Sequence, residues 1–119
     1  LLGHLTREAI IEQLFLSHLF VLGSFFETFG VVAIEANSIG LPVLSTPCGG
    51  VNDIVIDMFN GLITSKNTCE YIYNGINTIY SNFNDFDARA IVKFTQEKYS
   101  SENIANELVC IYKQAMNQK

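Results

Sequence analysis

The segment 25-FFETFGVVAIEANSIGLPV-43 carries the clearest structural pattern in the chain. It predicts a loop that runs into a helix over Phe29–Ser38, which Gly40 then stops as a C-cap. The predicted helix is apolar on nearly every side, yet Glu35 lies in the middle of it. Burying an unpaired carboxylate costs several kcal/mol, so this residue calls for an explanation. A second glutamate, Glu27, precedes the same helix by a few residues.

Short apolar runs alternate with stretches of helical periodicity along the rest of the chain. The predicted strands are the end of one at Leu1–Leu2, then Leu19–Leu22, Pro42–Ser45 and Leu62–Thr64. The predicted helices are Arg7–Leu16, Phe29–Ser38, a short turn at Asp53–Asp57, Cys69–Tyr80, Ala88–Lys98 and Glu102–Met116. This alternation predicts an α/β fold, a Rossmann-like parallel sheet with flanking helices. The apolar stripe of the last helix predicts that it packs in the core.

Two loops each follow a predicted strand, and the second is rich in small residues. They are Ser24–Thr28 and Thr46–Asn52, and the second contains Gly49–Gly50. In open parallel sheets, ligands bind beyond the carboxyl ends of the strands. We therefore expect the two loops to lie side by side at a binding edge, with a plain turn as the alternative reading of the glycine pair.

The start of the predicted helix after Glu27 suits an anion. The backbone N–H groups of Phe29, Gly30 and Val31 would be unsatisfied donors there, and their partial positive charge favours a phosphate. Glycine would let the anion approach closely, although an ordinary close-packing role is the alternative. Glu35 can accept two hydroxyl hydrogen bonds side by side, as the two hydroxyls of a ribose require. A solvated helix face or an ion pair is the alternative for Glu35.

These residues also form a family pattern. Glu27 and Glu35 make an E-x(7)-E pair inside the string E-[TS]-F-G-x-x-x-x-E-A, followed by G-x-P-V and a Gly-Gly loop. The sequence resembles the donor-binding half of retaining glycosyltransferases of family 4. That resemblance implies the C-terminal half of a GT-B fold, incomplete at its N-terminus. Residues 1–119 would then be a fragment, the nucleotide-sugar (donor) binding domain of a glycosyltransferase.

The resemblance implies a role for each residue of the pattern. Glu27 would be the catalytic residue and would bind hydroxyls of the donor sugar, whereas Glu35 would hold the ribose of the nucleotide. A helix-dipole role is the alternative for Glu27. The backbone amides after Thr28 would contact the sugar and the diphosphate. The implied substrate-binding set is Glu27, Thr28, Phe29, Gly30, Val31, Glu35, Gly49 and Gly50.

The charges of the chain limit what it can do alone. The net charge of −5 argues against nucleic acid or an anionic membrane surface as the main partner. No Lys or Arg occurs from Glu8 to Ser65. Departure of a nucleotide diphosphate needs cations or a metal. The resemblance implies an upstream Arg and Lys for that step and a missing N-terminal acceptor-binding domain. We therefore expect this chain to supply a donor site and to be inactive by itself.

Other residue types give weaker indications. The three cysteines, Cys48, Cys69 and Cys110, are widely spaced and are interpreted as buried thiols in a reduced, cytoplasmic setting. His4 and His18 have no second ligand at metal spacing, so neither a metal nor a cofactor is predicted. No apolar run is long enough to span a membrane. The alternative location is the inner face of the membrane, with which the parent enzyme would associate peripherally.

The predicted function is retaining hexosyl transfer from a UDP- or GDP-sugar, in the biosynthesis of a cell-envelope polysaccharide or glycoconjugate. A non-catalytic nucleotide-sugar-binding remnant or partner domain is the first alternative. A nucleotide-sugar 2-epimerase of the GT-B fold is the second. A dinucleotide dehydrogenase is disfavoured, because no G-x-G-x-x-G follows any predicted strand.

Overall fold

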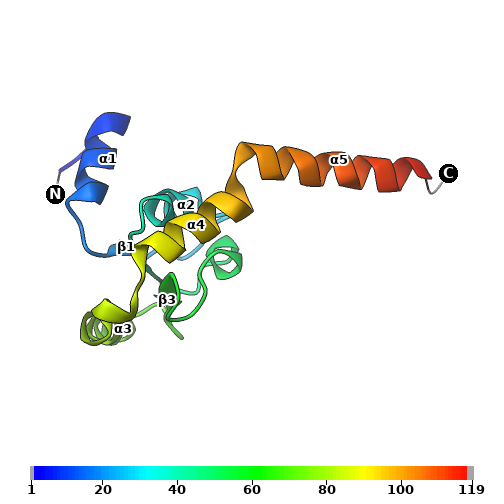
Figure 1. Ribbon diagram of the computed structural model, residues 1–119. Helices are drawn as coiled ribbons and strands as arrows, with labels where there is room; N and C mark the ends of the chain where they lie inside the picture. Colours follow the sequence, from blue (N-terminus) through cyan, green and yellow to red (C-terminus); the bar gives the residue numbers. More distant parts are fainter. Residues whose placement is uncertain (1, 118–119) are drawn as a thin grey trace.

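Three short parallel strands form the centre of the computed structural model, which describes residues 2–117 (Figure 1). The strands are β1 (Phe20–Leu22), β2 (Val43–Ser45) and β3 (Gly61–Ile63), and they lie in the order β1-β2-β3. Both pairings are parallel, with β2 in the middle and buried along its whole length. The predicted α/β fold with a parallel sheet is therefore confirmed.

Two strand predictions need correction. β3 begins at Gly61, one residue earlier than predicted, because Gly61 pairs with Val43. A Cβ atom at Gly61 would clash with the carbonyl oxygen of Val43, so only glycine fits at this point of the ladder. The predicted strand end at Leu1–Leu2 is not observed: Leu1 lies outside the described residues, and Leu2 belongs to no strand. Within residues 2–117, no neighbouring strand offers Leu2 a partner.

Five α-helices and two single turns of 3₁₀-helix surround the sheet within residues 2–117. They are α1 (Arg7–Phe15), α2 (Val31–Ser38), η1 (Gly50–Asp53), α3 (Cys69–Ser81), η2 (Phe83–Asp85), α4 (Ala88–Tyr99) and α5 (Ser101–Asn117). The helical turn predicted at Asp53–Asp57 is misplaced, because the chain enters η1 directly from Gly49. The turn η2 is not predicted at all. None of the described helices is both long enough and apolar enough to cross a bilayer.

Adjacent residues of β2 show that helices cover both faces of the sheet. Val43 belongs to the buried cluster that includes Ala33 and Ala36 of α2. Leu44 points the other way, and its side chain would lie 2.6 Å from a Cβ atom at Gly75 of α3. α2 and α3 therefore cover opposite faces, and α4 packs on the outer side of α2 (Figure 1).

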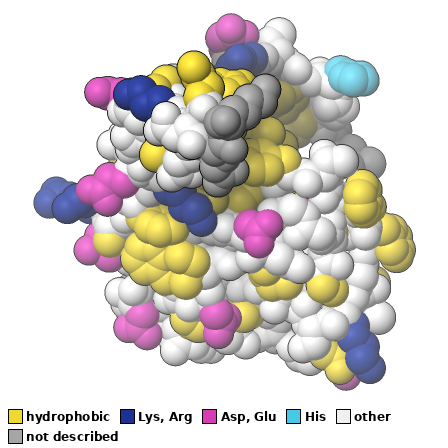
Figure 2. Space-filling view, turned by 90° about the vertical axis from the view of Figure 1, so that its right-hand side faces the viewer, with side chains coloured by type: hydrophobic (Ala, Val, Ile, Leu, Met, Phe, Trp, Pro, Cys, Tyr) yellow, Lys and Arg dark blue, Asp and Glu magenta, His cyan; other side chains and the backbone are white. Residues whose placement is uncertain are grey.

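The C-terminal helix α5 does not pack in the core, which contradicts the prediction from its apolar stripe. None of its residues is buried, and Figure 1 shows it extending away from the rest of the molecule. It contacts α4 near the Tyr99–Ser101 connection. Viewed nearly along this helix, the surface shows apolar side chains between charged groups of both signs (Figure 2).

The cysteine prediction holds for one residue and is wrong for two. Cys48 is buried, whereas Cys69 and Cys110 are exposed. Cys69 occupies the first position of α3, and Cys110 lies on α5, which buries none of its side chains. Free thiols on the surface therefore accompany the single buried one.

Two buried amide side chains tie the end of α2 to the entrance of β3. Asn37 Nδ2 donates to the carbonyl oxygens of Leu41 (3.0 Å) and Asn60 (3.1 Å). Asn60 Nδ2 donates to Asn37 Oδ1 and to the Ile54 carbonyl, both at 3.0 Å, and Asn60 Oδ1 accepts from the Ile56 N–H. Both side chains are almost completely buried, so each bond replaces one that water would otherwise supply.

Replacing Asn60 should therefore destabilise the fold. We expect Asn60→Ala to lower the free energy of unfolding by about 3 kcal/mol, because it leaves buried donors and acceptors without partners. Asn77→Ala is the matched control: Asn77 is exposed on α3, so its replacement should change stability by about 0.5 kcal/mol or less. Urea denaturation followed by circular dichroism measures both changes. Equal midpoints for the two variants would contradict a structural role of the amide pair.

Candidate functional site

The loops that follow β1 and β2 are joined through their backbones. The Glu27 N–H donates to the Cys48 carbonyl at 2.6 Å, and the Gly50 N–H donates to the Glu27 carbonyl at 3.0 Å. These bonds form an isolated parallel bridge between Glu27 and Gly49. The predicted adjacency of the two loops at the carboxyl edge of the sheet is therefore observed.

The glycine pair makes this junction sterically feasible. A Cβ atom at Gly50 would lie 2.5 Å from both Phe29 Cα and the Thr28 carbonyl oxygen. Gly49 has a φ of +100°, which residues with L side chains rarely adopt. A Cβ atom there would lie 2.9 Å from the backbone carbonyl oxygen of Glu27. Both glycines thus let two backbones approach closely, which is more specific than a plain turn.

Gly30 serves packing rather than access for an anion. It is the N-cap of α2, with φ of +88°, and it is buried. A Cβ atom there would lie 2.6 Å from Val51 Cγ2 and 3.3 Å from Ile54 Cδ1. The space left by the missing side chain is therefore filled by the core, as in the close-packing alternative. Its N–H group remains a candidate donor.

The start of α2 presents several N–H groups that the fold does not use. α2 begins at Val31, two residues later than predicted, because the left-handed backbone of Gly30 cannot belong to the helix. Across residues 2–117, no protein acceptor is recorded for the N–H groups of Phe29, Gly30, Val31 or Val32. The Ala33 N–H is the first that is paired, to the Gly30 carbonyl. Val32 is thus a fourth candidate donor, missed because the helix start was predicted too early.

Glu27, two residues before the first of these N–H groups, is half-buried. Ser24 Oγ donates to Glu27 Oε1 at 3.3 Å. The Ser24 carbonyl in turn accepts from Thr46 Oγ1 at 2.5 Å and from Asn67 Nδ2 at 3.1 Å. Ser24 and Thr46 belong to the two predicted binding loops, but no role of their own was predicted for them or for Asn67. Asn67 lies 43 positions from Ser24, so no local spacing could have indicated it.

Glu35 lies on the exposed face of α2, together with Val31, Val32 and Ser38. It lines a cavity of about 320 Å³ between α1 and α2. This placement agrees with the interpretation that Glu35 faces a cleft rather than the core, and exposure removes the desolvation cost. Because the helix starts at Val31, Glu35 is about 6 Å along the axis from its first residue.

Arg7 lines the same cavity and was not connected with Glu35 by sequence reasoning. The two residues are far apart in the chain, and only the fold brings α1 beside α2. No ion pair within 4.0 Å joins them in the described part of the chain. The other lining residues are largely aliphatic: Ile10, Ile11, Leu14, Ser38 and Ile39.

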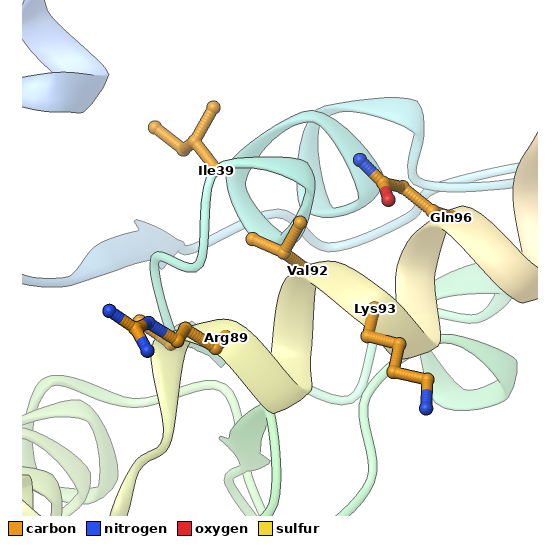
Figure 3. Close-up of a pocket in the computed structure, with 6 residues that line it drawn as sticks. Ile39, Arg89, Val92, Lys93 and Gln96 are labelled. Atoms are coloured by element: carbon orange, nitrogen blue, oxygen red, sulfur yellow. The ribbon is translucent and has the colours of Figure 1, made fainter.

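A second cavity, of about 440 Å³, lies between the C-terminal end of α2 and α4 and is not a candidate for phosphate binding. Ile39, the C-cap of α2, lines this cavity as well as the one beside Glu35, and residues of α4 form the rest of its lining (Figure 3). Arg89 and Lys93 line it, but Figure 3 shows their charged ends pointing away from each other. A phosphate site needs donors that converge on one point.

Comparison with known proteins identifies the family. The sequence profile described as "Glycosyl transferases group 1" matches residues 1–97, which include both loops and α2. The chain belongs to this family. It is 36% identical over 98 residues to an uncharacterized glycosyltransferase of Methanocaldococcus jannaschii, covering 81% of the chain and 25% of that protein. It is 32% identical over 91 residues to the D-inositol 3-phosphate glycosyltransferase of Corynebacterium urealyticum, covering 73% of the chain and 21% of that protein.

Solved structures agree with the family assignment and confirm the GT-B type of fold. Sucrose-phosphate synthase from Thermosynechococcus elongatus superposes with a TM-score of 0.81 at 25% identity, covering 99% of the chain and 30% of that structure. The Anabaena protein HepE in complex with UDP superposes with a TM-score of 0.79 at 22% identity, covering 91% of the chain and 30% of that structure. The chain therefore spans 21–30% of the length of these relatives.

The junction between the two loops can be tested with a pair of glycine substitutions. We expect Gly50→Ala to force the loops apart and to lower the free energy of unfolding by about 1–3 kcal/mol. Gly23→Ala is the control, because a Cβ atom there would have Ile72 Cδ1 as its nearest neighbour, at 4.0 Å. Thermal denaturation measures stability, and amide shifts of Glu27–Phe29 report the position of the loop. A Gly50→Ala variant as stable as Gly23→Ala would argue against the close approach.

Proposed function

We propose that this chain is the donor-binding part of a retaining glycosyltransferase that transfers a hexosyl group from a nucleotide-diphosphate sugar. One observation carries the proposal: within residues 2–117, four N–H groups at the start of α2 have no recorded protein acceptor, and the half-buried residue Glu27 precedes the first of them by two positions in the chain. The helix dipole and these donors favour the two phosphates. The carboxylate can accept hydrogen bonds from the hydroxyls of the sugar attached to them.

Glu35 and its cavity would hold the nucleoside. An exposed carboxylate accepts both ribose hydroxyls without a desolvation cost in the free protein. The aliphatic side chains of Ile10, Ile11 and Leu14 in the same cavity suit the flat ring of a base. Such a mixed lining, with few polar groups among apolar ones, is typical of small-molecule sites. The complex of the similar protein HepE with UDP supports a nucleoside diphosphate such as UDP as the carrier.

The roles of Glu27 and Glu35 divide between sugar and nucleotide. Glu27, as the proposed catalytic residue, would orient the sugar at the reacting carbon, while the Cys48 carbonyl and the Gly50 N–H hold the backbone of Glu27 in place. No Lys or Arg occurs from Glu8 to Ser65, so the loops after β1 and β2 supply no cation to the departing diphosphate. We therefore propose that the whole enzyme supplies it, together with the acceptor-binding domain, and that the chain alone binds donor without transfer.

We further propose that the whole enzyme works on a cell-envelope polysaccharide or glycoconjugate in the cytoplasm or at the inner face of the membrane. The similar D-inositol 3-phosphate glycosyltransferase supports transfer to a hydroxyl-bearing acceptor. A non-catalytic partner domain that binds nucleotide sugars is the second candidate. The lack of cations in the loops after β1 and β2 and the exposed apolar stripe of α5 favour it.

An NMR amide titration of the chain with UDP, GDP, UDP-glucose and GDP-mannose tests the proposal. We expect shifts to cluster at residues 24–35 and 46–52. Glu35→Gln should weaken binding of the nucleotide about tenfold or more, because it removes charge-assisted hydrogen bonds to the ribose. Glu107→Gln, on the exposed helix α5, is the control and should bind as the unmodified chain does. Unchanged shifts at saturating ligand would reject a donor site in this chain.

A separate substitution tests the assignment of Glu27. Glu27→Gln should weaken binding of UDP-glucose or GDP-mannose about tenfold while leaving UDP or GDP binding within about twofold, because only the sugar contacts this carboxylate. The ratio of the two dissociation constants is the measured quantity. An equal loss for free nucleotide and nucleotide sugar would reject a sugar-binding role for Glu27.

A further inference from the structure

We propose that Asn67, in the loop after β3, is a positioning residue that sets the location of the Glu27 carboxylate by anchoring Ser24. This inference rests on the proposed function only for the role of Glu27 as the sugar-binding group. The bonds themselves are direct: Asn67 Nδ2 donates to the Ser24 carbonyl, and Ser24 Oγ donates to the Glu27 carboxylate.

The segment between β1 and Glu27 has few other anchors. Within the described chain, no backbone hydrogen bond is recorded for the N–H groups of residues 23–26. Phe25 and Phe26 are strongly exposed, so packing does not fix the segment either. The carbonyl oxygen of Ser24 therefore carries its main attachment, through two donors, Thr46 Oγ1 and Asn67 Nδ2. The position of Ser24, and of the hydroxyl that holds Glu27, depends on these two bonds.

The two donors differ in what else they do. Thr46 is completely buried, and its N–H also bonds to the Leu22 carbonyl, so it belongs to the core of the sheet. Asn67 is only half-buried, and no other side-chain bond of Asn67 is recorded in the described residues. Asn67 is therefore the part of the anchor that can be removed while the fold is kept.

The chemistry of Asn67 also fits the position. An amide donates a hydrogen bond without a charge, so it fixes Ser24 without pairing with the Glu27 carboxylate. The neighbouring cation is directed elsewhere: Lys66 Nζ lies 5.5 Å from the centroid of the Tyr71 ring. With Asn67, all three strands contribute from their carboxyl ends to the place where the sugar would bind.

The inference is tested by comparing the binding of free nucleotides with the binding of nucleotide sugars in variants of the full chain. Asn67→Ala and Asn67→Asp are titrated by NMR with UDP, UDP-glucose, GDP and GDP-mannose. Loss of the donor should weaken nucleotide-sugar binding about fivefold and change free-nucleotide binding less than about twofold. The aspartate has the same size but cannot donate when ionised, so it should not rescue binding. Asn74→Ala, exposed on α3 and without a recorded side-chain bond, should bind as the unmodified chain does.

A ligand-free measurement separates this inference from the proposed function. The ¹³C resonance of the Glu27 carboxyl carbon should move in Asn67→Ala, while that of Glu35 should not. If the unmodified chain binds no nucleotide sugar, the proposed function fails, and this resonance alone decides whether Asn67 positions Glu27. An unmoved Glu27 resonance would overturn the inference. The inference would also be overturned if Asn67→Ala kept an intact fold in its amide spectrum and the ratio of nucleotide-sugar affinity to nucleotide affinity stayed constant.

Discussion

The close approach of the backbone at Glu27–Phe29 to the backbone at Cys48–Gly50 is the constraint on which the candidate site depends. Two hydrogen bonds hold the segments together, and there is no room between them for a side chain at Gly50. This contact holds the chain that leads into α2, whose first N–H groups have no recorded protein acceptor within residues 2–117. It also holds the backbone of Glu27. A short sheet of three-residue strands can support such a site because the loops stabilise each other.

The sequence predicted the elements with strong local periodicity and missed those set by distant contacts. The parallel strands and the helices α1, α3 and α4 follow from apolar spacing and caps, such as the Thr6 hydroxyl that accepts from the Ala9 N–H. The start of α2 does not, because Gly30 adopts its left-handed backbone against Val51 and Ile54, more than twenty residues away. Element boundaries near the site therefore required the three-dimensional contacts.

The same division applies to the site itself. The E-x(7)-E spacing indicated both glutamates, and the strand–loop order indicated that the loops converge. Arg7 and Asn67 could not be found in this way, since each reaches the site from a different element and makes no pattern with its neighbours in sequence. Periodicity likewise showed that α5 has an apolar face, but not that this face lies outside the core of residues 2–117.

The arrangement of α5 gives the molecule an uneven local stability. This helix of 17 residues buries no side chain and meets the body only near its first turn. Most of the stability of a helix in a protein comes from tertiary packing of its apolar face, and within residues 2–117 α5 has little of it. Its hydrogen bonds can therefore open by fraying while the sheet stays intact, so its amides exchange with solvent through local opening rather than global unfolding. The sheet and its loops keep their geometry during these openings, which makes the site thermodynamically independent of the far end of the chain.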